Sequence, residues 1–428
     1  MSVEQGTSSE PQSALLASQN PQSTGEYFTT FFKRLRAGDL GSLPIIFGFL
    51  VICVIFQAGN DNFLTPHNLV NLIVQSAGIT AIAYGVTFVL LLGEIDLSVA
   101  YVGGVSSVLM TIMLVPTGTT ATTWYFALEV IAITLAVAAA IGLFHGLIIT
   151  IFQVPSFIVT LAGLLGWQGV VLLIIGQGGT ILIQDKLVLG IANSYLGQDA
   201  TKTLVAPELG TIFGLLVVAA FAVTQVLQAR SRRRYGLKTS PLPIIALQTA
   251  GVAVAIFGTV YVCNLDRGVP VVGILLVILL AGLTFLAQST RFGRYVYAVG
   301  GNKEAARRAG IKVERIRVLV FMISSLMAGV GALILASRLR SVDTNTGGGS
   351  ILLDSIAAAV IGGTSLFGGR GKIWTAVLGA LIITGVENGM DLLGLSAGDK
   401  FIATGFVLLL AVIVDALSRR SQKQAGLA

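Results

Sequence analysis

The chain has 428 residues, of which 54% are hydrophobic and only 11% are charged, whereas an ordinary soluble domain carries about 25% charged residues. So few charges cannot cover the surface of soluble domains of this size, and such high hydrophobicity also argues against a disordered chain. The net charge of +7 does not require nucleic acid as a partner, because cationic cytoplasmic loops give a membrane protein the same excess.

In chain order, the first forty residues are polar and end in the cations Lys33, Arg34 and Arg36. We interpret residues 1–40 as a disordered cytoplasmic tail, residues 41–418 as a transmembrane domain and residues 419–428 as a second cytoplasmic tail. Helices are expected throughout the domain, because a lipid-exposed backbone must satisfy its own hydrogen bonds. The predicted fold is therefore an all-α polytopic membrane protein.

Apolar runs long enough to cross a bilayer of about 30 Å at 1.5 Å per residue define the predicted spans. We find twelve, at approximately 43–59, 68–92, 98–116, 125–151, 155–176, 207–228, 241–263, 268–288, 316–337, 351–367, 373–393 and 400–417. Runs 351–367 and 373–393 contain several glycines, so short, tilted or broken helices are expected there.

The distribution of the cations predicts the orientation of these spans. With a cytoplasmic N-terminus, 21 of the 27 Lys and Arg residues fall on the cytoplasmic side and 6 on the other side. Positively charged loops stay in the cytoplasm. We therefore expect both termini to be cytoplasmic.

Two glycine-flanked polar breaks occupy similar positions in the pattern of spans. Gly93–Ser98 ends the second span and Gly362–Leu366 ends the tenth. Such breaks at corresponding points are typical of transporters built from two related halves, so two pseudo-symmetric halves are expected. Two unrelated glycine-rich turns are the alternative interpretation.

Polar and small residues at the breaks are candidates to line a translocation pathway. Carboxylates inside a membrane are costly and usually functional or paired. Asp96 can instead cap the helix that follows it, whereas Glu94 has no such local role. The pathway candidates are Gln75, Glu94, Asp96, Gly362 and Asn388.

The loop over residues 289–315 carries both dense positive charge and the signals of a short helix. Asn302 is a suitable N-cap, Lys303–Ala309 has high helix propensity, and Gly310 is a natural stop. Small residues at Ala305, Ala306 and Ala309 would permit close docking. We predict a helix that docks a partner, with a solvated basic loop as the alternative.

Other constellations carry no recognisable chemistry. His67 and His145 are isolated, so no metal site is expected, and His145 should be buried in helix packing. The run Gly368–Ile373 lacks both the first glycine and the hydroxyl of a nucleotide-binding loop. We therefore expect no enzyme activity, no cofactor and no ATP hydrolysis by this chain. The cluster from Arg230 to Lys238 is interpreted as a topology anchor on anionic lipid.

Six motifs resemble those of the membrane permeases of bacterial ribose- and xylose-type ABC sugar importers, in the same order between about residues 45 and 418. They are Gly93–Val99 (GEIDLSV), Pro155–Leu161 (PSFIVTL), Phe292–Asn302 (FGRYVYAVGGN), Glu304–Arg307 (EAAR), Ala357–Ser365 (AAAVIGGTS) and Glu387–Met390 (ENGM). Glu94 departs from the pattern, since glycine usually stands there. Residues 207–263 look like the extra helix pair of the xylose-type members, which moves the expected sugar toward xylose.

The resemblance implies a permease that works with three partners in the bacterial plasma (inner) membrane. These are a second copy of the chain, a tandem-domain ATP-binding subunit on the cytoplasmic face, and an extracytoplasmic sugar-binding protein. The residues that it assigns to ATPase coupling are Gly300, Gly301, Asn302, Glu304, Ala305, Ala306, Arg307, Arg308 and Gly310. The alternative function is an ion-coupled secondary transporter, a class that usually carries carboxylates or histidines near the midplane.

Overall fold

The computed structural model describes residues 43–115, 123–176, 179–199, 203–236 and 241–406, together with Gly25, Thr29, Thr239, Leu409, Leu410 and Ile413. Apart from Gly25 and Thr29, the predicted tails at residues 1–40 and 419–428 lie outside the described residues, as do residues 407, 408, 411, 412 and 414–417 of the predicted span 400–417.

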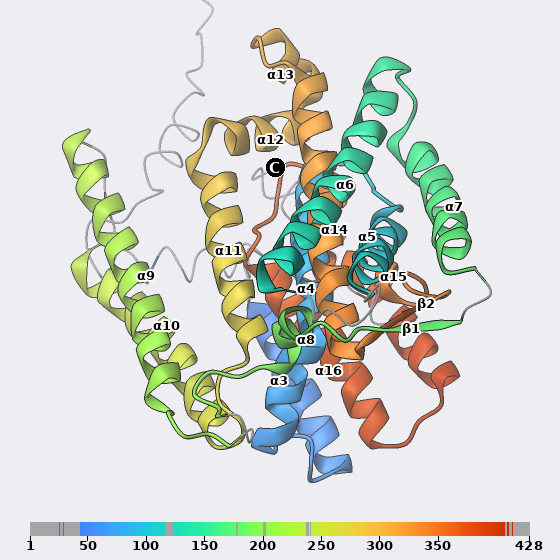
Figure 1. The fold of residues 1–428 in the computed structure, drawn as a ribbon. Coiled ribbons are helices and arrows are strands. Elements are labelled where there is room, and N and C mark those ends of the chain that lie inside the picture. Colours follow the sequence, from blue (N-terminus) through green and yellow to red (C-terminus); the bar gives the residue numbers. More distant parts are fainter. Residues whose placement is uncertain are drawn as a thin grey trace, which may run out of the picture.

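The described elements are helices and one small sheet (Figure 1). The helices are α3 (Leu43–Gly59), α4 (Pro66–Leu91), α5 (Val99–Leu114), α6 (Trp124–Ile151), α7 (Ser156–Ile175), α8 (Lys186–Asn193), α9 (Glu208–Arg234), α10 (Leu242–Asn264), α11 (Val271–Ser289), α12 (Arg291–Gly301), α13 (Lys303–Arg308), α14 (Val313–Leu339), α15 (Ile351–Ile361) and α16 (Thr375–Leu392). Strands β1 (Thr180–Leu182) and β2 (Ser341–Asp343) pair antiparallel, with Ile181 opposite Val342.

Seven of these helices are long and apolar enough to cross a membrane, namely α4, α6, α7, α9, α10, α11 and α14. Shorter apolar helices lie in α3, α5 and α15. The 11 residues of α15 reach about 16 Å, roughly half of the hydrocarbon thickness, because the predicted span 351–367 breaks at Gly362. The expected helical membrane architecture is confirmed apart from the small β1–β2 sheet, while the number of twelve spans and the two related halves stay predictions.

Four elements were not predicted. Helix α8 and strands β1 and β2 are too short to give a periodic signal. Helix α12 is amphipathic, with Gly293, Val296 and Val299 buried at three-residue spacing. That spacing is the ordinary signal of a surface helix, but the charges of the loop obscured it.

Helix α14 forms the centre of the molecule and packs against α4, α5 and α6 (Figure 1). Glycines on the neighbouring helices make this packing close. A Cβ on Gly103 would lie 2.7 Å from the Ala328 carbonyl oxygen, and one on Gly142 would overlap the Phe321 carbonyl oxygen. Small residues that let helix backbones approach are the usual packing device inside membranes.

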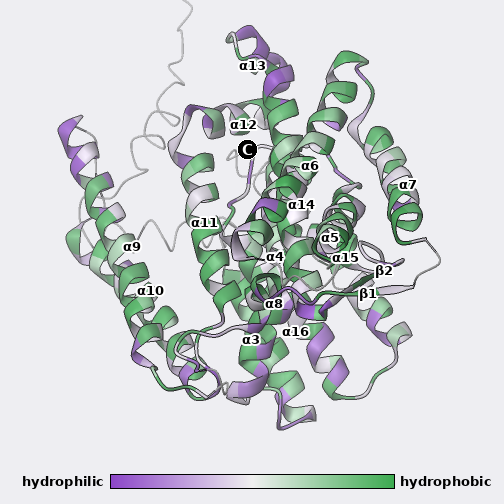
Figure 2. Cartoon of the chain, in the orientation of Figure 1, coloured by the Kyte–Doolittle hydropathy of each residue, from purple (hydrophilic) through white to green (hydrophobic). Residues whose placement is uncertain are grey.

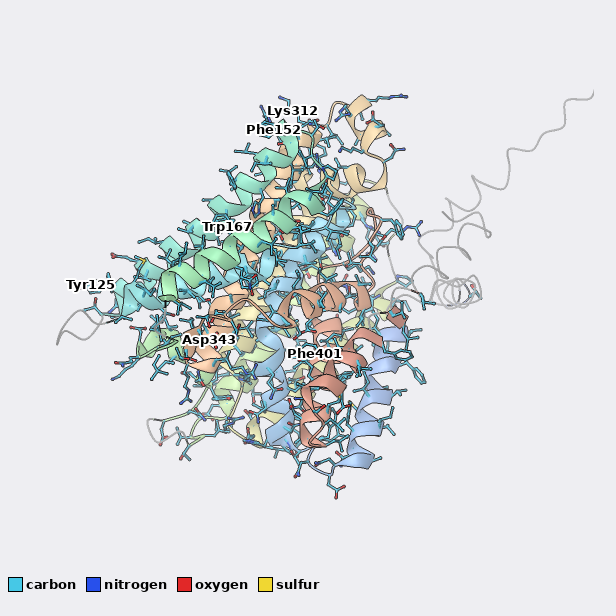
Figure 3. All side chains as sticks on the ribbon, turned by 90° about the vertical axis from the view of Figure 1, so that its right-hand side faces the viewer. Tyr125, Phe152, Trp167, Lys312, Asp343 and Phe401 are labelled. Atoms are coloured by element: carbon cyan, nitrogen blue, oxygen red, sulfur yellow. The ribbon has the colours of Figure 1, made fainter. Side chains whose placement is uncertain are left out.

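Helices α12 and α13 lie at one end of α14, which we call the α13 end. Figure 2 shows hydrophilic residues on α13 beyond the apolar helices. In Figure 3, Lys312 and Phe152 lie at the same end, while Asp343 lies farther along the molecule. Helices α9 and α10 lie side by side at the edge of the molecule, with α10 contacting α4.

Candidate coupling site and polar pathway

The predicted short helix is present as α13. The Asn302 side chain accepts a hydrogen bond from the Ala305 N–H at 2.9 Å and caps the helix. The helix ends at Arg308, one residue before the predicted end, and Gly310 follows with a φ of +83°. That left-handed conformation favours glycine, so both local boundary signals are confirmed.

Most of the predicted coupling residues are exposed on α13 and its flanks. They are Gly301, Asn302, Glu304, Ala305, Arg307, Arg308 and Gly310. Ala306 is the exception, because it is 5% exposed and packs in the same apolar cluster as Val313. The alanines therefore have different surroundings, and only Ala306 docks inward.

Arg307 forms ion pairs within α13 and with the start of α14. Its guanidinium donates to Glu304 at 3.1 Å and to Glu314 at 2.9 Å. These exposed ion pairs join α13 to the first turn of α14. Arg308 is exposed on the same helix and is therefore the clearer candidate for contact with a partner.

Gly300 occupies a different environment from the exposed coupling residues. A Cβ there would overlap the Leu91 carbonyl oxygen at the end of α4 and would lie 2.8 Å from the Gly369 nitrogen. The Gly369 N–H donates to the same Leu91 oxygen at 2.8 Å. Gly300 therefore makes internal backbone contacts.

The first glycine-flanked break and the residues that follow Gly362–Leu366 meet at this point. A Cβ on Gly368 would lie 2.7 Å from the Gly300 carbonyl oxygen and 2.9 Å from the Gly93 nitrogen. Nearby, the Tyr297 hydroxyl donates to the Gly371 carbonyl oxygen at 2.8 Å. Burial raises the pKa of Tyr297, which keeps this hydroxyl available as a donor. Two motif segments, at Gly93 and Gly300, and the glycine-rich run at Gly368 and Gly369 are far apart in the sequence and thus touch through their backbones.

Asp96 does not cap the helix after it, contrary to the prediction. Ser98 is the N-cap of α5 and makes no capping hydrogen bond with its side chain. One Asp96 oxygen accepts from the Ser98 N–H at 3.0 Å and the Ser98 hydroxyl at 2.6 Å. The other accepts from the Ser324 hydroxyl at 2.9 Å. The Asp96 carboxylate therefore binds Ser98, just before α5, and also joins this segment to α14.

His145 extends this buried network to α6 and α7. The Trp167 indole N–H donates to His145 Nε2 at 3.1 Å, and His145 Nδ1 lies 3.2 Å from the Ser98 hydroxyl. Since an indole can only donate, Nε2 acts as the acceptor and Nδ1 carries the proton. His145 is 2% exposed, as predicted for a histidine in helix packing, and it also joins three helices.

Glu94, the departure from the family pattern, forms an ion pair with Arg317 on α14. The side chains are 13% and 8% exposed, respectively. Arg317 follows the basic loop at residues 289–315, but it lies inside the molecule. Its partner could not be found from the sequence, because 223 residues separate the two.

Two of the pathway candidates are brought together. The Asn388 amide donates to Gln75 at 3.3 Å and to Asn68 at 3.1 Å, and the Asn68 amide donates back to Asn388 at 2.8 Å. Gly362 packs elsewhere, since its Cβ would lie 2.6 Å from the Thr375 carbonyl oxygen. The five predicted residues thus occupy separate places: the α4–α16 amide cluster, the first break and the second break.

Asp354, in the first turn of α15, was missed by the sequence reasoning. It is 1% exposed, and its Oδ1 accepts no hydrogen bond from the described residues. Glu387 on α16 and Ser350 are the polar side chains beside it. An aspartate within an otherwise apolar run is the signal that could have identified it.

Comparison with known proteins gives a consistent result. The family described as branched-chain amino acid transport system / permease component matches residues 68–417. The xylose transport system permease protein of Escherichia coli (strain K12) is 36% identical over 390 residues, which cover 91% of this chain and 95% of that protein. The corresponding protein of Haemophilus influenzae is 35% identical, covering 90% and 99%.

A ribose import permease protein also matches. The Bacillus subtilis (strain 168) protein is 33% identical over 91% of this chain and 98% of its own length. No solved structure matches the chain. The resemblance to ribose- and xylose-type permeases is therefore confirmed.

Proposed function

The chain belongs to the family of the branched-chain amino acid transport system permease component, and on that premise we propose that it is the transmembrane permease subunit of a bacterial ABC importer for xylose or a related monosaccharide. The observation that carries this proposal is the 36% identity to a xylose permease over 91% of the chain. Two copies would form the pathway, and an extracytoplasmic binding protein would deliver the sugar.

A separate tandem-domain ATPase would supply the energy by docking on α13. The exposed cations at the α13 end support this arrangement, and they are Arg291, Arg294, Lys303, Arg307, Arg308, Lys312 and Arg315. Positive charge also favours the cytoplasmic side. We propose accordingly that the protein lies in the bacterial inner membrane, with the α13 end and both termini facing the cytoplasm.

The function is tested by sugar uptake into proteoliposomes that contain the permease, its ATPase and the sugar-loaded binding protein. We expect uptake that requires ATP, with xylose competing more strongly than ribose. Uptake that persists without ATP and collapses with an ionophore would instead establish the ion-coupled secondary transporter. Equal competition by both sugars would contradict the expected preference for xylose.

The docking assignment is tested with Arg308→Glu. This change leaves the Arg307 ion pairs intact, so a loss of ATPase binding would report contact with the partner. We expect at least a tenfold weaker association with the ATPase, because a charge reversal at an interface creates repulsion. Lys186→Glu on α8 makes the same charge change outside this region and should leave association unchanged. Equal association of both variants with the ATPase would exclude Arg308 from the interface.

We further propose that the pathway runs past the α4–α16 amide cluster and Asp354. Amide and carboxylate groups match the hydroxyls of a sugar, and broken helices build transporter sites near the midplane. Asp354→Asn should lower sugar uptake at least tenfold while leaving membrane insertion unchanged. The control is Asp391→Asn, which removes an exposed carboxylate of α16 paired with Lys400. Equal uptake by the two variants would remove Asp354 from the pathway.

A further inference from the structure

Two irregular segments interrupt the helices at positions that converge on α12. The first break, residues 92–98, separates α4 from α5, and the second break, residues 362–374, separates α15 from α16. Gly300, next to the last residue of α12, contacts Leu91, the residue just before the first break, and Gly368 in the second break, which in turn contacts Gly93 in the first. Irregular backbone at membrane depth is tolerated only where protein buries it or where it lines a cavity.

The contact at Gly300 leaves no room for α12 to shift alone. A Cβ on Gly300 would overlap the Leu91 carbonyl oxygen, while one on Gly368 would lie 2.7 Å from the Gly300 oxygen. Backbone therefore touches backbone without a flexible side chain between the segments. Because packed interiors are close to incompressible, a displacement of α12 toward these segments must displace the end of α4 before the first break and the second break at Gly368.

The first break is also attached to α14 at two points. Glu94 pairs with Arg317, and Asp96 accepts from Ser324 at 2.9 Å. Arg317 and Ser324 are seven residues apart, about two turns on one face of the helix. Two anchors at this spacing hold the break along α14.

Helices α12 and α13, which we call the coupling segment, are connected directly to this helix. The Arg307 guanidinium on α13 bonds Glu314 in the first turn of α14 at 2.9 Å, one turn before Arg317. A series of ion pairs on α14 therefore connects α13 to the first break: Arg307 pairs with Glu314, and Arg317 pairs with Glu94. A second route runs through α12 and Gly300.

We propose that the junction formed by Gly93, Gly300 and Gly368, together with the Glu94–Arg317 ion pair, transmits movement of α12 and α13 to both helix breaks. Gly300, Glu94 and Arg317 act as positioning residues that keep the breaks in register with the coupling segment. This inference rests on the proposed function as an ATP-driven permease. It also assigns a role to Glu94, where related permeases usually carry glycine.

The first test replaces Gly300 with alanine and measures sugar transported per ATP hydrolysed in the reconstituted complex. The added Cβ must push α12 away from Leu91, so we expect at least a tenfold lower ratio with ATPase activity within threefold of the wild type. Gly282→Ala in α11 is the control, because a Cβ there meets nothing within 4 Å. If Gly300→Ala transports as much sugar per ATP as the wild type, the junction does not transmit the movement.

The second test stands even if Gly300→Ala fails to insert. Glu94→Gln and Arg317→Gln each remove one charge of the pair while keeping a polar side chain of similar length. We expect each to lower the transport ratio several-fold, and the double variant to be no worse than either single one. Normal ratios in all three inserted variants would make the pair merely structural and refute its role in transmission.

A distance measurement separates this inference from the proposed function. After replacement of Cys53 and Cys263 by alanine, spin labels at Phe367 in the second break and Tyr235 after α9 would sit on side chains that are 70% and 78% exposed. We expect their separation to change with ATP in the wild-type complex and in Gly282→Ala, but not in Gly300→Ala. If the wild type takes up sugar with ATP but shows no such change in distance, the proposed transmission through the junction is wrong, while the proposed function stands. Absence of ATP-driven uptake by the wild type would contradict the proposed function.

Discussion

Removal of Arg317 should destabilise the protein far more than removal of its exposed neighbour Arg315. In Arg317→Ala the Glu94 carboxylate would lose its ion-pair partner, although its side chain is only 13% exposed. Its second oxygen already accepts no hydrogen bond from the described residues. Leaving one member of a buried pair without its partner costs about 3–5 kcal/mol, whereas an exposed surface substitution changes stability by about 0.5 kcal/mol or less.

The assay is thermal unfolding in detergent, followed by tryptophan fluorescence, with Arg315→Ala measured under the same conditions. We expect a clearly lower midpoint for Arg317→Ala and an unchanged one for Arg315→Ala. The double variant Glu94→Gly with Arg317→Met should recover most of the loss, because apolar replacement of a whole buried pair is often neutral or stabilising. Equal midpoints for Arg317→Ala and Arg315→Ala would refute the buried pair.

Two further predictions concern stability. Gly142→Ala should lower the unfolding midpoint, because the added Cβ would overlap the Phe321 carbonyl oxygen and overpacking costs about 1–3 kcal/mol. The control is Gly169→Ala in α7, where a Cβ meets nothing within 4 Å, so this variant should be neutral or stabilising. A lower midpoint for Gly169→Ala than for Gly142→Ala would contradict the close packing of α6 against α14. Burial raises the pKa of Asp266 in the loop after α10, but hydrogen bonds from Arg267 and His67 outweigh it and hold the pKa below 3.8. The carboxylate therefore stabilises the fold above about pH 4, and this contribution is lost as the pH falls through the lowered value. Asp266→Asn should lower the midpoint at pH 6, and its difference from the wild type should shrink as the pH falls below about 4. A constant difference across this range would contradict the assignment.

The apolar runs and the boundaries of α13 were predictable because their causes are local. Membrane helices follow from run length and hydrophobicity, and the ranges 43–59 to 373–393 are occupied by helices. Asn302 and Gly310 act on residues within one turn of themselves. A sequence window of a few residues is therefore enough to predict the two ends of α13.

The prediction for Asp96 was wrong for the complementary reason. Aspartate before an apolar run is a good cap signal, but Ser98 is the N-cap of α5. The Asp96 side chain accepts from Ser98 and also from Ser324, which is 228 residues away. Glu94 and Arg317 are separated by 223 residues, and Asn68 and Asn388 by 320. No local pattern specifies such partners.

The sequence by itself determined the membrane class, the positions of the apolar helices, the basic segment with its capped helix, and the family, because these depend on composition, local spacing and ordered motifs. Only the tertiary structure decided that the two helix breaks meet close to α12 at Gly300, that Glu94 has a buried cationic partner, and that Asp354 lies in the interior. These are matters of proximity between distant segments, and in this protein proximity is set by close backbone packing around α14.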